Sequence, residues 1–351
     1  MHQFKHLDPL LAAAAINQSL TPAMRVTAAG EPRRIGVEIE FAGLELNTVA
    51  DLLASVFGGR ISYDTDYEIT VANSELGKFR VEIDFELLKR IGQERVASGQ
   101  APGALEQMSE ELLAGVARQL VPCEIVTPPL PIDRLYTLDH LVGRLREAGA
   151  KGTDGALLYA FGVHFNVEAP SLRALSILRY LRAFALLYDW LLIQLKVDSL
   201  RRLSPFIKPF PSRYLQLILQ ADYRPTRETL IADYLTHNPT RNRALDMLPL
   251  FAHIDPQRVF AAIDDPRVHA RPTYHYRLSN SFVSDPTWRI SSEWRYWLLV
   301  EALAEDKDRL RAMADDYLKL IDRPLGDLFS EWSKRTDLWL QKRLKAAPKN
   351  R

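Results

Sequence analysis

The chain has 351 residues, of which 47% are hydrophobic and 25% are charged. This composition predicts a globular protein with a substantial core, organised as one large domain or two ordinary ones. The 45 basic and 44 acidic residues give a formal net charge of +1, so no global field favours nucleic acid or an anionic membrane as a partner.

Compartment signals come from a single cysteine and from the distribution of apolar residues. Cys123 is the only cysteine, which excludes an internal disulfide framework and a cysteine-rich zinc site and fits a reducing cytosol. The apolar run from Leu10 to Ile16 has no strongly cationic leader, and no uncharged apolar stretch is long enough to span a bilayer. We therefore expect a cytoplasmic protein with no membrane partner.

No internal repeat or composition shift marks a domain boundary, so the division of the chain is predicted from its glycine, proline and polar turn residues. We expect residues 1–30 to form a peripheral extension, residues 31–320 the main domain, and residues 321–351 a charged helix and tail.

The main domain begins with a strand at residues 33–41, in which Glu38 and Glu40 alternate with apolar residues. Side chains repeat every two residues along a strand, so both carboxylates lie on one face, roughly 7 Å apart. A divalent ion that bridges them would offset their repulsion, and Mg²⁺ prefers such oxygen ligands. An amphipathic strand with a solvated acidic face is the alternative, and this motif alone does not decide between them.

The next elements predict a helix followed by an antiparallel meander. Asn47 and Thr48 predict the cap of a helix that runs through Val56 and ends at Gly58 and Gly59. Three β-rich segments then predict short strands at residues 61–63, 67–71 and 78–85, and helical patterns follow at residues 87–96 and 105–120.

Further strands and helices alternate through the remainder of the chain. We expect strands within residues 121–130, at 157–167 and at 273–278, and helices at residues 135–147, 172–195, 288–304, 307–321 and 328–344, with shorter helices up to residue 262. Strands that arrive as a meander, with helices grouped between them, favour an α+β fold with a mainly antiparallel sheet. No glycine-rich phosphate-binding motif is present.

Several predicted strands carry polar residues at alternate positions. Glu124 lies in one such strand, His164 shares a face with Asn166 in another, and His275 shares a face with Arg277 in the last. Each is ordinary when taken singly, because a lone strand histidine is more often a hydrogen-bonded core residue than a ligand. The Arg241-Asn242-Arg243 segment lies at a predicted helix start, where exposed backbone N–H groups favour an anion.

Five motifs in this order resemble the amidoligase branch of the glutamine synthetase-like carboxylate–amine ligase superfamily. They are G-V-E-I-E-F, C-E-I-V-T-P-P-L, F-G-V-H-F-N-V, R-N-R-A-L-D and H-Y-R-L, and the resemblance covers residues 31–320. It implies a curved, mainly antiparallel sheet like the catalytic domain of glutamine synthetase, with helical insertions and a helical C-terminus. It also implies ATP and two or three Mg²⁺ ions as cofactors. In such enzymes ATP phosphorylates a carboxylate, and an amine or ammonia then displaces phosphate from the acyl phosphate.

The resemblance assigns Glu38, Glu40 and Glu124 to metal ions, and His164 to a metal or phosphate contact. Asn166 stands where many relatives have a second histidine, so we expect it on the nucleotide side. His275 stands where many relatives have a glutamate that helps to hold a metal ion. An imidazole suits Mn²⁺ better than Mg²⁺, so either His275 is a ligand and Mn²⁺ is accepted, or other groups complete the site; we favour the second.

Two arginine regions complete the predicted site. Arg243, with Arg241 and Asn242 beside it, resembles the region that contacts the acyl phosphate or the substrate carboxylate, and Arg277 resembles the last-strand arginine that contacts phosphate. Arginine forks of this kind neutralise charge during phosphoryl transfer. One of Glu82 and Asp84, on the strand at residues 78–85, is expected to face the amine substrate.

The resemblance predicts an ATP- and Mg²⁺-dependent ligase acting on amino acids or small peptides, with small molecules as its partners and an oligomer left open. Two alternatives use the same residues. One is a metal-dependent kinase or phosphohydrolase with a different acceptor, and the other is a catalytically silent nucleotide-binding or scaffold protein.

Overall fold

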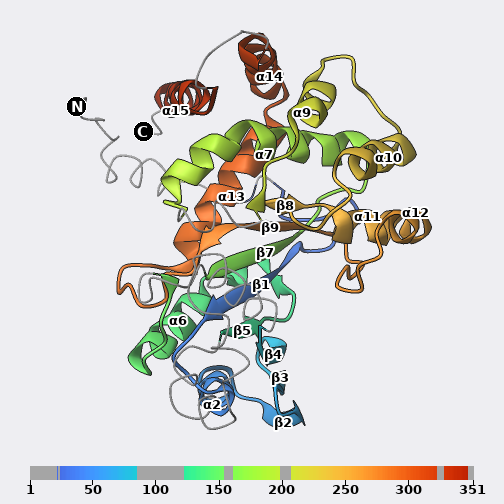
Figure 1. Ribbon diagram of the computed structural model, residues 1–351. Coiled ribbons are helices and arrows are strands. Elements are labelled where there is room, and N and C mark those ends of the chain that lie inside the picture. Colours follow the sequence, from blue (N-terminus) through green and yellow to red (C-terminus); the bar gives the residue numbers. More distant parts are fainter. Residues whose placement is uncertain are drawn as a thin grey trace, which may run out of the picture.

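The computed structural model describes residues 22, 24–84, 122–153, 161–197, 207–321 and 328–346 (Figure 1). Its strands are β1 (Arg34–Phe41), β2 (Arg60–Thr65), β3 (Glu68–Ser74), β4 (Gly77–Ile83), β5 (Cys123–Val126), β6 (Leu130–Pro131), β7 (Gly162–Glu168), β8 (Leu245–Asp246) and β9 (Thr273–Asn280). They form one nine-stranded sheet in the order β2-β3-β4-β5-β1-β7-β9-β8, with β6 paired to β1. Each of these strand pairs is antiparallel.

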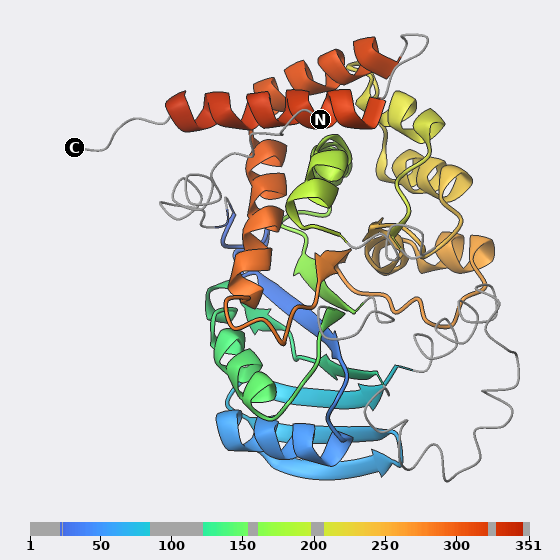
Figure 2. The same cartoon turned by 60° about the vertical axis from the view of Figure 1, so that its left-hand side comes forward.

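The helices occupy the stretches between and after these strands. They are α2 (Leu46–Phe57), α6 (Thr137–Glu147), α7 (Ala174–Gln194), α9 (Ser212–Leu219), α10 (Arg227–His237), α11 (Leu248–Ile254), α12 (Pro256–Ala262), α13 (Ile290–Glu305), α14 (Lys307–Ile321) and α15 (Leu328–Ala346), with a 3-10 turn at Ile132–Arg134. Figure 2 shows α2, α6 and α13 along one side of the sheet. Among the described residues, no helix is both long and apolar enough to cross a bilayer.

Helices α2 and α13 pack on the face of the sheet that carries the apolar members of the strands. Aromatic contacts fix this packing along the sheet: the Phe57 ring of α2 stacks on Phe79 of β4 at 5.4 Å between centroids. At the other end, Trp294 of α13 meets Phe165 of β7 edge-on at 5.7 Å. Such pairs add to the stabilisation that comes from burying apolar area. The opposite face, on which the polar members of each strand lie, is thereby left for the site.

The structure confirms the α+β class, the mainly antiparallel sheet and the meander of β2, β3 and β4. The strands predicted at residues 33–41 and 273–278 appear as β1 and β9, and the helices predicted between residues 288 and 344 appear as α13, α14 and α15. The helices predicted at residues 87–96 and 105–120 lie outside the described residues, as does the first part of the strand predicted at residues 157–167.

Two predictions of helix starts are wrong. Helix α2 begins at Leu46 after Glu45, with no side-chain cap, so Asn47 and Thr48 lie inside its first turn. Its end at Gly58 is as predicted, because φ is +68° there and glycine adopts that conformation without strain. The segment at residues 241–243 does not start a helix but leads into β8, because Arg277 N–H of β9 bonds the Ala244 carbonyl and draws this segment to the sheet edge.

A buried ion pair fastens the start of β1 to α13. The Arg33 guanidinium binds Glu301 through two N–H groups, at 2.7 and 3.2 Å, and both side chains are fully buried. Its remaining donors bind the backbone carbonyls of Glu168 and Met24, and Trp297 Nε1 donates to Glu301 at 2.9 Å. Every donor of the guanidinium therefore has a partner, which is the condition for a buried charge to be tolerated.

Removing one partner of this pair should be costly, because the other charge would stay buried and unpaired. We expect Glu301→Gln to lower the free energy of unfolding by about 3 to 5 kcal/mol. The double variant Arg33→Met/Glu301→Leu should recover much of that loss, since two apolar side chains leave no buried charge. Urea unfolding followed by circular dichroism measures both, and a cost below about 1 kcal/mol for the single variant would contradict the pair's role.

Candidate functional site

Four glutamates stand directly opposite one another across four neighbouring strands. The register pairs Glu40 of β1 with Glu124 of β5, Glu124 with Glu82 of β4, and Glu82 with Glu68 of β3. We call these four residues the acidic row. Like charges that face each other across a ladder are destabilising, so the row needs compensating cations.

A compensating cation lies beside the outer half of the acidic row, which is formed by Glu68 and Glu82. Arg80 Nε lies 2.6 Å from a carboxylate oxygen of Glu82 and 3.7 Å from one of Glu68. In the inner half, His164 is the basic side chain that approaches, with Nε2 3.4 Å from Glu40. One Glu40, one Glu124 and one His164 ligand atom all lie within 4.8 Å of one another, the spacing of a set that could hold a metal ion.

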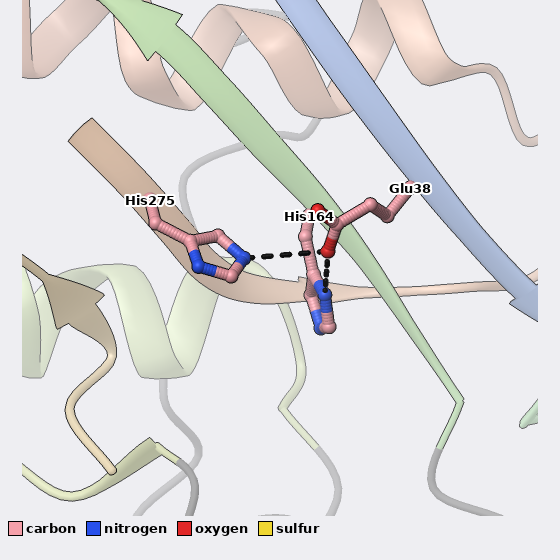
Figure 3. Close-up of side chains that lie close together, drawn as sticks. All are labelled: Glu38, His164 and His275. Carbon is pink, nitrogen blue, oxygen red and sulfur yellow. Dashed lines mark hydrogen bonds and ion pairs between the residues drawn. The ribbon is translucent and has the colours of Figure 1, made fainter. Parts of the chain in front are cut away.

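The carboxylate of Glu38 belongs to a second group on the same face. Its Oε2 is 2.9 Å from His164 Nδ1 and 3.3 Å from His275 Nε2 (Figure 3). These three side chains come from β1, β7 and β9, which are adjacent in the sheet. They form the second set of residues whose ligand atoms lie close enough for a metal ion.

His164 lies between the two carboxylates of the Glu-x-Glu strand. Its Nδ1 faces Glu38 and its Nε2 faces Glu40, so the imidazole takes the bridging position that we expected for a cation. Each carboxylate then has a separate metal-binding set, Glu40 with Glu124 and Glu38 with His275. The two sets share His164, which makes this residue the centre of the site.

Burial and neighbouring charges hold Glu124 close to its protonated form. Burial raises the pKa of this carboxyl well above its ordinary value, and the negative charges of Glu38, Glu40, Asp84 and Glu82 raise it further. A divalent cation beside Glu40 would favour the ionised form of Glu124.

The pKa of Glu38 is shifted in the opposite direction. Burial alone would raise it, but His275 and His164 together hold it well below its ordinary value. The pKa of His275 is also well below its ordinary value, because it is buried and lies beside Arg277. Arg277 Nη2 can only donate, so at 3.3 Å it makes His275 Nδ1 an acceptor. His275 Nε2 lies 3.3 Å from Glu38 Oε2 but makes no hydrogen bond to the described residues.

A β-bulge sets the position of Arg277. Between the pairs Val163–Ser279 and Phe165–Tyr276, one residue of β7 opposes two of β9. Bulges often lie next to active sites, where they re-aim a side chain.

Arginines gather at the end of the site that lies across β1 from the acidic row. Arg277 Nη2 binds the fully buried Asp246 of β8 at 3.1 Å, and Arg241 Nε lies 4.0 Å from the same carboxylate. Burial and the charge of Arg277 lower the pKa of Arg241. One carboxylate does not neutralise two guanidinium groups, so this end of the site is basic.

Asn166 and Arg271 extend the basic end toward Glu38. The Asn166 side chain donates from Nδ2 to Glu38 Oε1 at 2.8 Å, and its Oδ1 accepts from Nε and Nη2 of Arg271 at 3.1 and 2.6 Å. Sequence reasoning missed Arg271 and Asp246. Arg271 lies in the loop before β9 and Asp246 in a two-residue strand, so neither belongs to a periodic pattern.

The other predicted residues make contacts outside the two metal-binding sets. Asp84 follows β4, where its backbone N–H bonds the Pro122 carbonyl. Arg243 Nε donates to Asn238 Oδ1 at 2.7 Å, and the backbone N–H of Asn242 donates to Thr240. None of the ion pairs among the described residues joins Arg243 to the site carboxylates.

The donor chemistry of the site fits a divalent cation. Glu40 and Glu124 supply carboxylate oxygens, which suit Mg²⁺ and Mn²⁺, and an imidazole beside them suits Mn²⁺ and later first-row metals better than Mg²⁺. Glu40 is already fixed for such a role, because its Oε2 accepts from the backbone N–H of Gly162 at 2.6 Å.

Comparison with known proteins places this chain within a family. Residues 31–299, more than half of the chain, match the sequence model of a family described as "Putative amidoligase enzyme". That description indicates an enzyme that forms amide bonds. No curated protein and no solved structure matches the chain.

Replacing Glu124 with its uncharged isostere should stabilise the metal-free protein at neutral pH. The folded-state pKa is raised above the ordinary value of 4.5, so the ionised carboxylate destabilises the fold increasingly as pH rises above about 4.5. We expect Glu124→Gln to melt above wild type at pH 8 in EDTA and level with it near pH 4, because only the ionised carboxylate carries this penalty.

Added MgCl₂ or MnCl₂ should reverse that order by raising the melting temperature of wild type more than that of the variant. Glu147→Gln is the matched control, because its side chain is 69% exposed on α6. A Glu124→Gln protein that is less stable than wild type at every pH, or that gains equally from the cations, would contradict this assignment.

Proposed function

The chain belongs to the amidoligase family, and on this premise we propose that it joins a carboxylate to an amine with ATP as the energy source. In the proposed reaction the carboxylate attacks the terminal phosphorus of ATP, giving an acyl phosphate and ADP. The amine then attacks the acyl carbon, phosphate leaves and an amide forms, with the amine losing a proton. We propose amino acids or small peptides as substrates, and a place for the family in the glutamine synthetase-like superfamily.

This proposal rests on one observation above all. Ligand atoms of Glu40, Glu124 and His164 lie within 4.8 Å of one another on the polar face of the sheet. These residues would hold a divalent cation, Mg²⁺ or Mn²⁺, and a second cation could lie with Glu38. A bound cation supplies charge neutralisation for phosphoryl oxygens, which is a main requirement of phosphoryl transfer.

The charge distribution of the site supports a reaction between two differently charged substrates. Arg277 and Arg241 make one end basic, which suits ATP phosphates and the carboxylate substrate. Glu82 and Asp84 lie toward the acidic end, where an amine would be held as a cation before it loses a proton. We keep Arg243 and Asn242 as predicted contacts of the acyl phosphate, and Asn166 on the nucleotide side.

The residues of the chain have separate tasks in this scheme. His164, fixed between Glu38 and Glu40, orients both carboxylates toward the same face. His275 Nδ1 accepts from Arg277, and its Nε2 lies 3.3 Å from Glu38 Oε2. Preorganised groups of this kind stabilise developing charge without reorganising during the reaction.

A trapping assay tests the reaction without knowledge of the amine. We expect the wild type, with ATP, MgCl₂ and a panel of carboxylic acids, to release ADP and to form a hydroxamate when hydroxylamine replaces the amine. Glu40→Gln should lower this rate by about a hundredfold or more, because it removes one oriented contact to developing charge, while Glu147→Gln should keep it.

Each alternative gives a different result in the same assay. Release of ADP without hydroxamate for any acid would identify a kinase or phosphohydrolase. Binding of ATP, seen as a higher melting temperature, without turnover would identify a silent nucleotide-binding protein. If Glu40→Gln kept near wild-type turnover, the acidic row would have no part in the reaction.

A further inference from the structure

Arg271 is the guanidinium of this site that is both held in place and open to a ligand. Its backbone is fixed, since its N–H donates to the Pro249 carbonyl at 3.0 Å and its carbonyl accepts from Thr273 at 2.8 Å. Its Nε and Nη2 groups both bind Asn166 Oδ1. Within the described part of the chain, neither Nη1 hydrogen has a protein partner, and 29% of the side chain is exposed.

The other arginines of the basic end are less available. The Arg277 side chain is only 7% exposed and its Nη2 is shared between Asp246 and His275. Arg243 donates to Asn238. Arg241 lies near Asp246 at 4.0 Å and is 20% exposed. Because Asn166 holds one edge of the Arg271 guanidinium, the opposite end keeps the planar fork that binds two oxygens of an oxyanion.

Asn166 links Arg271 to the carboxylates of the site. Its amide accepts from Arg271 and donates to Glu38, and Glu38 in turn bonds His164, which faces Glu40. Arg271 Nη2 also lies 3.8 Å from Glu38 Oε1. An oxyanion on the open end of Arg271 would therefore lie beside the residues proposed to hold a cation.

We propose that Arg271 binds a phosphoryl group of the nucleotide, and that Asn166 is the positioning residue that sets it beside the metal-binding carboxylates. This inference rests on the proposed function, because it takes ATP as a substrate. The adjacency of Arg271 to Glu38 favours a phosphoryl group over the substrate carboxylate, because a nucleotide phosphate shares its oxygens with the divalent cation.

Calorimetry with the non-hydrolysable analogue AMP-PNP and MgCl₂ tests the inference. We expect Arg271→Gln to bind AMP-PNP about tenfold to a hundredfold more weakly than wild type, since hydrogen bonds to charged groups are of that strength. Arg271→Lys should be intermediate, because lysine keeps the charge and loses the fork. Arg258→Gln is the matched control, since that arginine is paired with Asp255 on α12 and is 44% exposed.

Binding of Mn²⁺ alone separates this role from a general loss of structure. Arg271→Gln should keep its Mn²⁺ affinity within about threefold, because a guanidinium repels a cation and does not ligate it. Asn166→Ala should weaken AMP-PNP binding as well, and the double variant should lose little more, because residues that act as one unit are not additive.

Three results would overturn the inference. Arg271→Gln could bind AMP-PNP within about twofold of wild type, which would move the phosphoryl contact elsewhere. If the losses of AMP-PNP affinity from Asn166→Ala and Arg271→Gln were additive, Asn166 would not be the positioning residue for Arg271. A wild-type protein that binds no AMP-PNP with either cation would overturn the proposed function and this inference together, and so differs from failure of the variant alone.

Discussion

The register of β1 against its two neighbours is the constraint on which the site depends. Glu40 faces Glu124 on β5, and Glu38 faces His164 on β7, so one strand supplies a carboxylate to each of two groups. Because side chains alternate, the same register places Val37 and Ile39 in the core beneath the helices. A slip of one residue would bury the glutamates and expose the core. The register that builds the core therefore also positions the site carboxylates.

Electrostatic balance explains the arrangement around this strand. Glutamates that oppose each other across the sheet repel. Arg80 relieves the repulsion at the outer end, and His164 Nε2 lies beside Glu40 at the inner end. Across β1, Arg277 and Arg241 outnumber Asp246. The result is a polar face with an acidic end and a basic end, joined through Asn166. Such a face can hold a cation and an anion next to each other, which is the common requirement of enzymes that activate carboxylates with ATP.

The strands of the site could be predicted from alternation alone. The pattern around Glu38 and Glu40 predicted β1 and its polar face, and the segment with His275 and Arg277 predicted β9, which runs two residues further than expected, to Asn280. Which residues meet across the sheet could not be predicted, because register depends on the pairing of distant strands. The acidic row and the separation of Glu38 from Glu40 by His164 followed only from the structure.

The site residues that the sequence patterns missed lie in loops and short strands. Asp246 is in a strand of two residues and Arg271 in a connection, where no periodicity distinguishes a functional side chain from a solvated one. Residues 241–243 follow a proline-containing turn typical of a helix start, yet a backbone bond between β9 and Ala244 draws the segment to the sheet. In each case a long-range contact decides the outcome over the local signal.

The central claim is that Glu40, Glu124 and His164 form a divalent cation site on the polar face. Anomalous diffraction from crystals of the protein grown with MnCl₂ tests it most directly, because manganese can be located independently of any assumed reaction. We expect an anomalous peak within coordinating distance of the Glu40 and Glu124 carboxylates, about 2.0 to 2.4 Å from their oxygens. A map with manganese bound elsewhere and no peak beside these carboxylates would contradict it.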